Sequence, residues 1–205
     1  MKPLTLPLKD RAVRNLQVGD EVSLSGVLVT GRDAAHRWLV DCFVEERQRA
    51  TDEDRRVYQA LRPLLKGGAI YHCGPVVGGL DTGNYRFVAA GPTTSIREEP
   101  YQGAVMRHFS VQTVIGKGGM GPGTLQACME VPGVYLHAVG GAAALIARRV
   151  RRVLGVYKLE FGVPEALWVI EVANFTAVVT MDAHGRSLHD EVACRSGAVL
   201  SSLLA

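Results

Sequence analysis

Apolar runs rich in β-branched residues alternate with segments whose apolar residues recur at helical spacing, and this alternation limits the possible folds most strongly. Residues 21–30 (EVSLSGVLVT) predict a strand after a turn at 18–20. Apolar positions between 35 and 43 then follow a helical period, and Asp33 is placed to cap that helix. Acidic residues after Thr51 predict the start of a second helix. This order of elements predicts the α/β class.

The rest of the chain continues the alternation. The segment 134–139 is predicted as a strand that leads into a helix over 141–154, with 148–152 (RRVRR) on its exposed face. Further predicted elements are strands at 69–73, 85–90, 113–115, 167–172 and 177–182, a glycine-rich connection at 78–84, a short helix after Thr94 and Ser95, a helix from about 124, and a turn at 182–185 that contains His184. The sequence has no repeat, low-complexity tract or linker, so we expect one domain over 1–205.

Composition and charge narrow the class of protein. Hydrophobic residues make up 47% and charged residues 21%, which is ordinary for a globular chain, and a formal charge of +3 is too small to indicate a nucleic-acid partner. Residues 1–15 carry prolines and charges where a signal peptide needs a continuous apolar core. The most apolar stretch, 134–147, is shorter than the roughly 20 residues of a membrane span. We therefore expect a cytoplasmic protein with no membrane or nucleic-acid partner.

The four cysteines lie far apart in the sequence, at Cys42, Cys73, Cys128 and Cys194. Structural zinc and iron–sulfur sites normally use cysteines at close spacing. We therefore expect reduced cysteines and no metal site within this chain. If the chemistry of the protein needs an iron–sulfur centre, another chain is expected to hold it.

The stretch 114–121 (VIGKGGMG) places Lys117 in a glycine-rich turn after an apolar run. It is a weak match to the Gly-x-x-Gly loop of KH domains, because Gly121, Pro122 and Gly123 oppose the helix that must follow. It also lacks the spacing of a nucleotide P-loop. On pattern alone, such a turn is more often plain turn chemistry than a binding site.

Further stretches favour a site for a small anion. Arg32 and Arg97, like Lys117, follow predicted strands, where α/β proteins place ligand groups. Two guanidinium groups and an ammonium group around one cleft suit a compact dianion, since arginine binds carboxylates with two parallel hydrogen bonds. The alternative is that each cation pairs with a local acid such as Asp33 or Glu98, an alternative favoured for Arg97.

Six stretches occur in order along the chain: GRDAAH, HCGPVV, AAGPTTSIR, VIGKGGMG, FGVPEALWV and VVTMDAHG. In this order they resemble the β subunit or C-terminal domain of class I fumarases and of the related L-tartrate dehydratases. The match runs from about Val18 to about Leu188, and the combination of GPTTS-x-R with GKGGMG is its most specific part. The chain length suits the form of these enzymes in which a separate gene encodes the α subunit.

The resemblance implies half of an iron–sulfur hydro-lyase. In that family the α part holds a [4Fe-4S] cluster by three cysteines, and one iron is left open to the substrate. The β part has a swivelling β/β/α fold that closes the active site from the other side. The implied reaction is the reversible hydration of fumarate to L-malate, a step of the tricarboxylic acid cycle, with a fumarase-type α subunit in an α2β2 assembly. Tartrate dehydration to oxaloacetate and a non-catalytic module derived from this domain remain alternatives.

The resemblance also assigns roles to residues of this chain. Thr93 corresponds to the threonine proposed to transfer a proton, and the family has Met where Glu98 stands here. A carboxylate beside Arg97 can draw that arginine away from a substrate. The family's substrate-binding positions fall on Arg32, Thr93, Arg97 and Lys117, while Asp33, His36, Gly116 and Gly118 are expected to support them and His72 to pack behind them.

Overall fold

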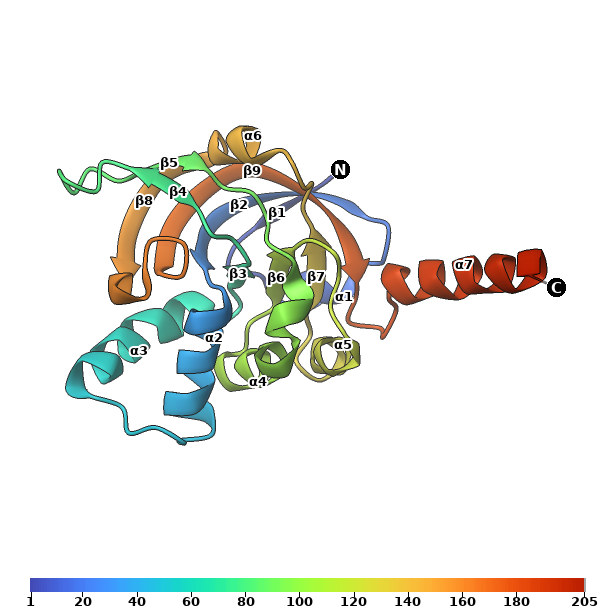
Figure 1. The fold of residues 1–205 in the computed structure, drawn as a ribbon, viewed down its shortest axis with the longest axis horizontal. Helices are drawn as coiled ribbons and strands as arrows, with labels where there is room; N and C mark the ends of the chain where they lie inside the picture. Colours follow the sequence, from blue (N-terminus) through green and yellow to red (C-terminus); the bar gives the residue numbers. More distant parts are fainter. Residues whose placement is uncertain (205) are drawn as a thin grey trace.

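The computed structural model describes residues 1–204 and contains a sheet that closes on itself (Figure 1). Three parallel strands lie side by side at its centre, β2 (Glu21–Thr30), β3 (Ala69–Tyr71) and β6 (Thr113–Gly116). The parallel strand β7 (Val134–His137) follows β6, and the antiparallel strand β9 (Leu167–Met181) pairs with both β7 and β2, which completes the ring. The prediction of an α/β fold is confirmed.

Further strands extend this ring at its edges. β1 (Lys2–Thr5) pairs in parallel with β2, and β8 (Val150–Tyr157) pairs antiparallel with β9. A separate hairpin is formed by β4 (Val76–Gly78) and β5 (Arg86–Ala89). Because β9 is long enough to pair with three other strands, it is the element that holds the barrel closed.

Helices cover the barrel unevenly. In Figure 1, α2 to α5 lie together on one side of the barrel, whereas α6 and the β4–β5 hairpin lie on the other. The helical segments are α1 (Asp10–Arg14), α2 (Asp33–Leu39) continued by a π-helical turn (Val40–Val44), α3 (Asp52–Leu65), a 3-10 turn (Ser95–Glu98) continued by α4 (Glu99–Phe109), α5 (Pro122–Glu130), α6 (Ala143–Ala147), a 3-10 turn (Leu159–Phe161) and α7 (Leu188–Leu204).

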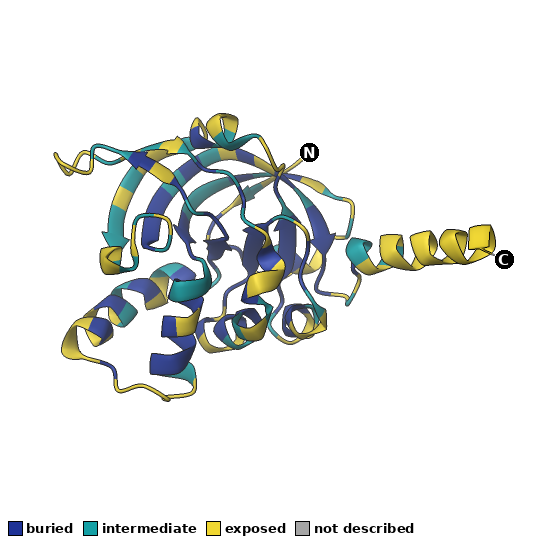
Figure 2. Ribbon diagram, viewed as in Figure 1, coloured by how far each residue is buried: buried dark blue, intermediate teal, exposed yellow. Residues whose placement is uncertain are grey.

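The short strands β3, β6 and β7 are buried on both faces, which explains why their sequences read as continuous apolar runs. Alternate residues of β6 face different cores, since Ile115 belongs to the cluster inside the barrel and Val114 to the cluster beneath the helices. Leu28 and Val29 divide in the same way on β2. In Figure 2 the central strands are coloured as buried, whereas α7 and the outer surfaces of α3 to α5 are coloured as exposed.

Several sequence-based boundaries are wrong. The predicted helix over 141–154 is only the short α6, and residues 150–157 form strand β8, so the arginines of 148–152 do not share one helix face. The predicted strands at 167–172 and 177–182 are one strand, β9. Asp33 does not cap α2, because the N-cap position is Arg32 and has no side-chain cap. The helix predicted to start after Thr51 is α3, and Thr51 caps it in a capping box with Asp54.

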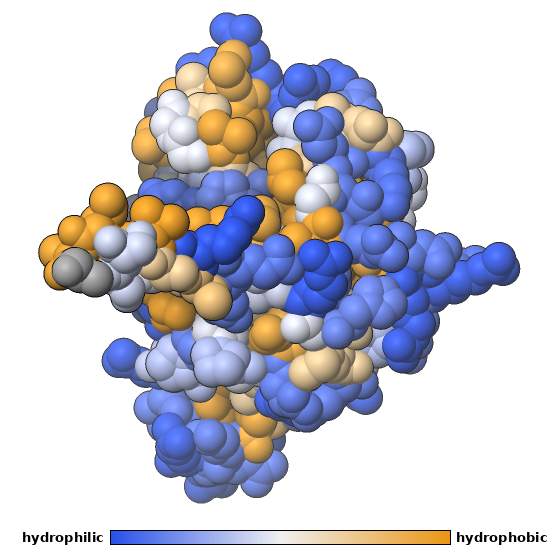
Figure 3. Space-filling model, turned by 90° about the vertical axis from the view of Figure 1, so that its right-hand side faces the viewer, coloured by the Kyte–Doolittle hydropathy of each residue, from blue (hydrophilic) through white to orange (hydrophobic). Residues whose placement is uncertain are grey.

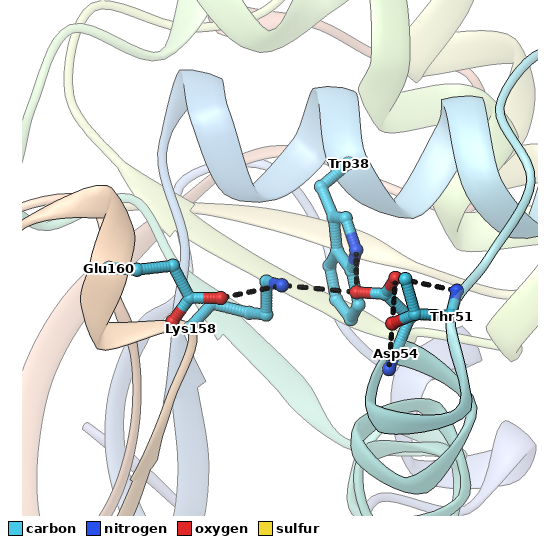
Figure 4. A network of polar contacts seen from close by, with 5 residues as sticks. All are labelled: Trp38, Thr51, Asp54, Lys158 and Glu160. Atoms are coloured by element: carbon cyan, nitrogen blue, oxygen red, sulfur yellow. Dashed lines mark hydrogen bonds and ion pairs between the residues drawn. The ribbon is translucent and has the colours of Figure 1, made fainter.

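A buried ionic network joins the start of α3 to the barrel (Figure 4). Asp54 accepts hydrogen bonds from Thr51, from the indole nitrogen of Trp38 (2.9 Å) and from Nζ of Lys158 (3.0 Å). Lys158 also pairs with Glu160 at 2.6 Å. Burial alone would raise the pKa of Asp54, but the hydrogen bonds from Thr51, Lys158 and Trp38 hold it well below its usual value of 3.8.

Asp54→Asn is expected to lower the free energy of unfolding at pH 7 by about 2 kcal/mol, because Lys158 loses a buried anionic partner. Since the folded-state pKa of Asp54 is depressed, its stabilisation is present above pH 3.8 and is lost as pH falls below that value. Urea denaturation should therefore show a difference in the free energy of unfolding between wild type and Asp54→Asn that is smaller at pH 3 than at pH 7. Glu160→Gln, at a mostly exposed position, is the control and should cost less than about 1 kcal/mol.

The last helix, α7, projects away from the barrel and is exposed along almost its whole length (Figures 1 and 2). Its exposed apolar residues include Val192, Val199, Leu200 and Leu203. Figure 3 views the molecule from the side on which α7 projects and shows hydrophobic residues gathered there. Within residues 1–204, no helix is both long and apolar enough to cross a membrane.

Candidate active site

The candidate site lies where three neighbouring parallel strands end. Arg32 follows β2, His72 follows β3 and Lys117 follows β6. The register pairs Thr30 with Tyr71 and Tyr71 with Ile115, so the strands end at the same edge of the barrel. This is the edge at which open α/β sheets bind their ligands.

The segment 92–95 (PTTS) lies between the ends of β3 and β6 and extends the sheet there. The amide of Thr93 donates to the carbonyl of His72 (2.8 Å), and the amide of Lys117 donates to the carbonyl of Thr93 (3.2 Å). The amide of Ser95 in turn donates to the carbonyl of Lys117 (3.0 Å). The structure therefore brings two of the predicted site residues, Thr93 and Lys117, directly together.

The side chains of this pair have different surroundings. Nζ of Lys117 donates to the carbonyl of Pro92 (3.1 Å), which accounts for one of its three protons. The hydroxyl of Thr93 is buried and has no hydrogen-bond partner within residues 1–204. An unpartnered buried hydroxyl is unfavourable, and a bound ligand would supply the missing partner.

Arg32 is held at the edge of the site by residues from the opposite end of the chain. Its Nε lies 3.2 Å from Oε1 of Glu165, and Oε2 of Glu165 accepts a hydrogen bond from the amide of Ala34 (3.1 Å). The guanidinium packs against Gly74, where an added Cβ would come within 2.5 Å of Nη1 of Arg32. Within the described residues, Nε of Arg32 is buried and has no hydrogen-bond partner, so its ion pair with Glu165 leaves hydrogen-bonding capacity for a carboxylate.

Arg97 and Asp33 form an ion pair at the same end of the molecule, with Nη2 of Arg97 2.8 Å from Oδ2 of Asp33. Both side chains are partly exposed. The alternative that Arg97 pairs with a local acid is therefore the arrangement in the structure, although its partner is Asp33 and not Glu98. Arg97 can reach a ligand only by sharing or leaving this pair.

Glu98 is fully buried, and neither of its carboxyl oxygens has a hydrogen-bond partner within the described residues. Burial, assisted by the nearby negative charge of Asp33, raises the pKa of Glu98 to about 7, against the opposing influence of Arg97 and Arg32. The carboxyl group therefore changes its charge close to neutral pH, next to two of the predicted substrate-binding arginines.

Glu98→Gln is expected to remove a pH dependence of stability. The folded-state pKa of about 7 lies above the usual value of 4.5, so the folded protein binds a proton that the unfolded chain has lost. Wild-type stability should then fall as pH rises from 4.5 to 7, by about 3 kcal/mol from this group. Urea denaturation should show that the free energy of unfolding of Glu98→Gln, relative to that of the wild type, is higher at pH 8 than at pH 5. An equal difference at both values would contradict the assignment, and Glu53→Gln on the exposed side of α3 is the control.

The glycines of 116–119 serve the geometry of the site. Gly118 and Gly119 have φ values of +81° and +82°, in the left-handed region that favours glycine. Gly116 is needed for space, because a Cβ there would lie 1.8 Å from Oγ of Ser95 and 3.0 Å from the hydroxyl of Tyr135. The predicted supporting roles of Gly116 and Gly118 are therefore explained by close packing and by backbone conformation.

Several polar residues beside the site were not predicted from the sequence. Ser95 was predicted only to precede a short helix, but its hydroxyl contacts His72 (2.8 Å) and Tyr135 (2.9 Å). Gln102 contacts both His36 and His72. Gln102 carries no local sequence pattern that could have identified it, because its partners come from other elements.

A metal site in this chain would need clustered ligands with accessible lone pairs. Within residues 1–204, no group of three or more His, Cys, Asp or Glu side chains could hold a metal ion. Cys73 and Cys128 are buried, and burial raises the pKa of each thiol to about 12, which disfavours the thiolate that metals bind. The described residues therefore do not fit an iron–sulfur cluster.

Comparison with known proteins decides the family. The family described as "Fumarase C-terminus" matches residues 3–192, nearly the whole chain. The chain belongs to this family. The fumarase C-terminus match includes every residue of the candidate site and ends within α7.

The relatives of this chain fall into two groups, one much longer than the chain and one of similar length. The chain is 50% identical over 189 residues to a "Putative fumarate hydratase class I" of Geobacillus stearothermophilus. The aligned residues make up 92% of this chain but only 34% of that relative. The chain is 36% identical to the "L(+)-tartrate dehydratase subunit beta" of Escherichia coli (strain K12), with 91% of this chain and 86% of the relative covered. A "Putative L(+)-tartrate dehydratase subunit beta" of Methanocaldococcus jannaschii is also 36% identical, with 90% and 89% covered. The chain thus spans about a third of the fumarate hydratase and most of each tartrate dehydratase β subunit.

Proposed function

We propose that this chain is the β subunit of a two-subunit hydro-lyase that hydrates fumarate reversibly to L-malate. The family match and the hydro-lyase names of the relatives support the reaction class. Fumarate is favoured over tartrate because the fumarate hydratase is the more similar relative, at 50% against 36% identity. The tartrate dehydratase relatives are named as β subunits, which supports a separate α chain and keeps tartrate dehydration as the second candidate.

The observation that carries the proposal is the pairing of Thr93 with Lys117 at the strand ends. An unpartnered hydroxyl lies next to a lysine there, in a segment that also leads to Arg97. Arg32 follows the neighbouring strand, and its buried Nε has no hydrogen-bond partner within the described residues. Fixed cations and a polar hydroxyl at one sheet edge suit a small dianion.

Each side chain then has a role in the proposed reaction. Hydration adds a hydroxyl group to one alkene carbon and a proton to the other, and negative charge grows on the neighbouring carboxylate on the way. Arg32, Lys117 and Arg97 would bind the two carboxylates and stabilise that charge, an effect typically worth several kcal/mol. Thr93, whose backbone carbonyl accepts from the Lys117 amide and whose hydroxyl has no protein partner within the described residues, would exchange the proton with the substrate carbon.

The proposal extends to a partner. The α subunit would hold the [4Fe-4S] cluster and face this edge of the barrel, in an α2β2 assembly in the cytoplasm. This chain would form one domain of the swivelling β/β/α type. The half of the site that this chain lacks would come from the partner.

The test is reconstitution without oxygen. This chain is mixed with a class I fumarase α chain that carries its cluster, and the consumption of fumarate and of L-tartrate is followed. Turnover is expected only in the mixture, and fumarate is expected to react faster. Activity of this chain alone would contradict the divided site, and turnover of tartrate alone would transfer the assignment to the second candidate.

A further inference from the structure

A chain of buried polar groups lies directly beneath the candidate site. His36, His72, Ser95, Gln102 and Tyr135 are each no more than 1% exposed. One side-chain amide atom of Gln102 lies 2.9 Å from Nε2 of His36 and 2.8 Å from Nε2 of His72. Gln102 is therefore the point at which the two histidines meet.

The positions of the protons in this row of buried polar groups can be assigned by starting from the backbone carbonyl of Arg32 at one end. Nδ1 of His36 lies 2.9 Å from the carbonyl oxygen of Arg32, and a carbonyl only accepts, so Nδ1 carries the proton. Burial lowers the pKa of His36, and it lowers that of His72 to about 3, so both rings are neutral at pH 7. Nε2 of His36 is then an acceptor and needs a donor opposite it.

Only the amide nitrogen of Gln102 can be that donor. The structure assigns the contacting atom as Oε1, which would oppose an acceptor on His36 and leave Nε2 of Gln102 without a partner. The two ends of an amide have the same shape, and the hydrogen-bond network decides between them. Turned over, the amide group donates one proton to each histidine.

The directions of the remaining hydrogen bonds follow from this assignment. His72 accepts at Nε2 and therefore donates from Nδ1 to the hydroxyl of Ser95, 2.8 Å away. Tyr135 donates to the same hydroxyl at 2.9 Å. The network thus runs from the carbonyl of Arg32, through Gln102, to Ser95, in the segment that contains Thr93 and whose backbone pairs with Lys117.

We propose that Gln102 is a positioning residue, whose amide group donates to His36 and His72 and so holds the Arg32 loop in register with the Thr93 and Lys117 loops. Its effect on catalysis rests on the proposed function, whereas the pattern of protons does not. The residue acts through the histidines and the loops and does not touch the substrate.

The first test needs neither substrate nor partner. In the full chain labelled with 15N-histidine, the ring nitrogen shifts of His36 and His72 are measured between pH 5 and pH 8, with His36→Asn and His72→Asn used for assignment. Both rings are expected to be neutral with the proton on Nδ1 at pH 7 and pH 8, and His72 is expected to stay so at pH 5. An imidazolium at pH 7, or a proton on Nε2 of His36, would overturn the assignment of Gln102 as donor.

The second test uses Gln102→Glu, which keeps the shape of the side chain but replaces the donor by an acceptor, with Gln59→Glu on the exposed face of α3 as control. His36 is expected to become protonated near neutral pH, and KM for the dicarboxylate to rise at least about 10-fold in the reconstituted complex, with a smaller change in kcat. An active complex with unchanged KM would overturn the positioning role. The expected ring shifts in a complex that never turns over would contradict the proposed function alone.

Discussion

Replacing Lys117 by alanine is expected to lower kcat/KM of the reconstituted complex by at least about 100-fold, and the larger share of the loss should fall on kcat. Removal of one preorganised group that stabilises developing negative charge typically costs about 100- to 1000-fold. Lys117 has only one protein acceptor within the described residues, the carbonyl of Pro92, so the rest of its hydrogen-bonding capacity is available to substrate. The free energy of unfolding should change by less than about 1 kcal/mol, because the side chain is partly exposed.

Two matched variants separate a site effect from a general loss of charge. Lys66→Ala removes a lysine from the exposed end of α3 and should leave turnover unchanged. Lys117→Arg keeps the charge but changes the donor geometry, so it should recover only part of the activity. Equal turnover of Lys117→Ala and wild type, measured by steady-state kinetics on the intact complex, would remove Lys117 from the site.

Gly116→Ala is expected to destabilise the chain by more than about 4 kcal/mol, or to prevent folding. The added methyl group would lie 1.8 Å from Oγ of Ser95 and 3.0 Å from the Tyr135 hydroxyl, far inside contact distance. Both neighbours are fully buried and hydrogen-bonded to each other, so neither can move away without losing a buried partner. Urea denaturation followed by circular dichroism measures the effect.

The double variant Gly116→Ala with Ser95→Ala tests that explanation. Removing Oγ takes away the closest contact, and the next atom of residue 95, its Cβ, is 3.2 Å from the position of the added methyl group. The double variant should therefore be more stable than Gly116→Ala alone, a coupling that a thermodynamic cycle isolates. Gly197→Ala, in α7 where nothing lies within 4 Å, is the control and should be neutral or slightly stabilising. Additive effects of the two substitutions would show that another contact limits position 116.

The parts of the fold that follow from local sequence were predictable. The apolar run of β2 and the Thr51 cap of α3 both depend on neighbouring residues, and both are present. Strand β8 was taken for a helix because its partly buried valines Val150, Val153 and Val156 recur every third residue. Irregularities in its pairing with β9 shift the register between these valines, so a bulged strand acquires a nearly helical period.

Strand β9 was divided for a similar reason. Asn174 has a φ of +54°, and its neighbourhood reads as a turn between two strands. In the structure the chain continues through this residue, and the register of β2 shifts opposite it, between Leu24 and Gly26. Because pairing with a distant strand decides this, local sequence could not show it.

In the candidate site, too, some residues were predictable from the sequence and others were not. Arg32, Thr93 and Lys117 were identified by their positions after strands and by family motifs, and the structure places all of them at the ends of neighbouring strands or in the segment between. The partners of those residues were not predictable. Glu165 reaches Arg32 across more than half the chain, and Gln102 joins histidines from two other elements.

The central claim, that Arg32 and Lys117 bind the two carboxylates of one ligand, is tested most directly by comparing two inhibitors of the reconstituted complex. Succinate carries two carboxylates and butyrate only one on a chain of the same length. Inhibition constants for both are measured in wild type, Arg32→Ala, Lys117→Ala and the exposed control Arg11→Ala. In wild type and the control, the inhibition constant for succinate is expected to be at least about 10-fold lower than that for butyrate, and Arg32→Ala and Lys117→Ala should each lose most of that preference. A preference for succinate that survives both substitutions would contradict the claim.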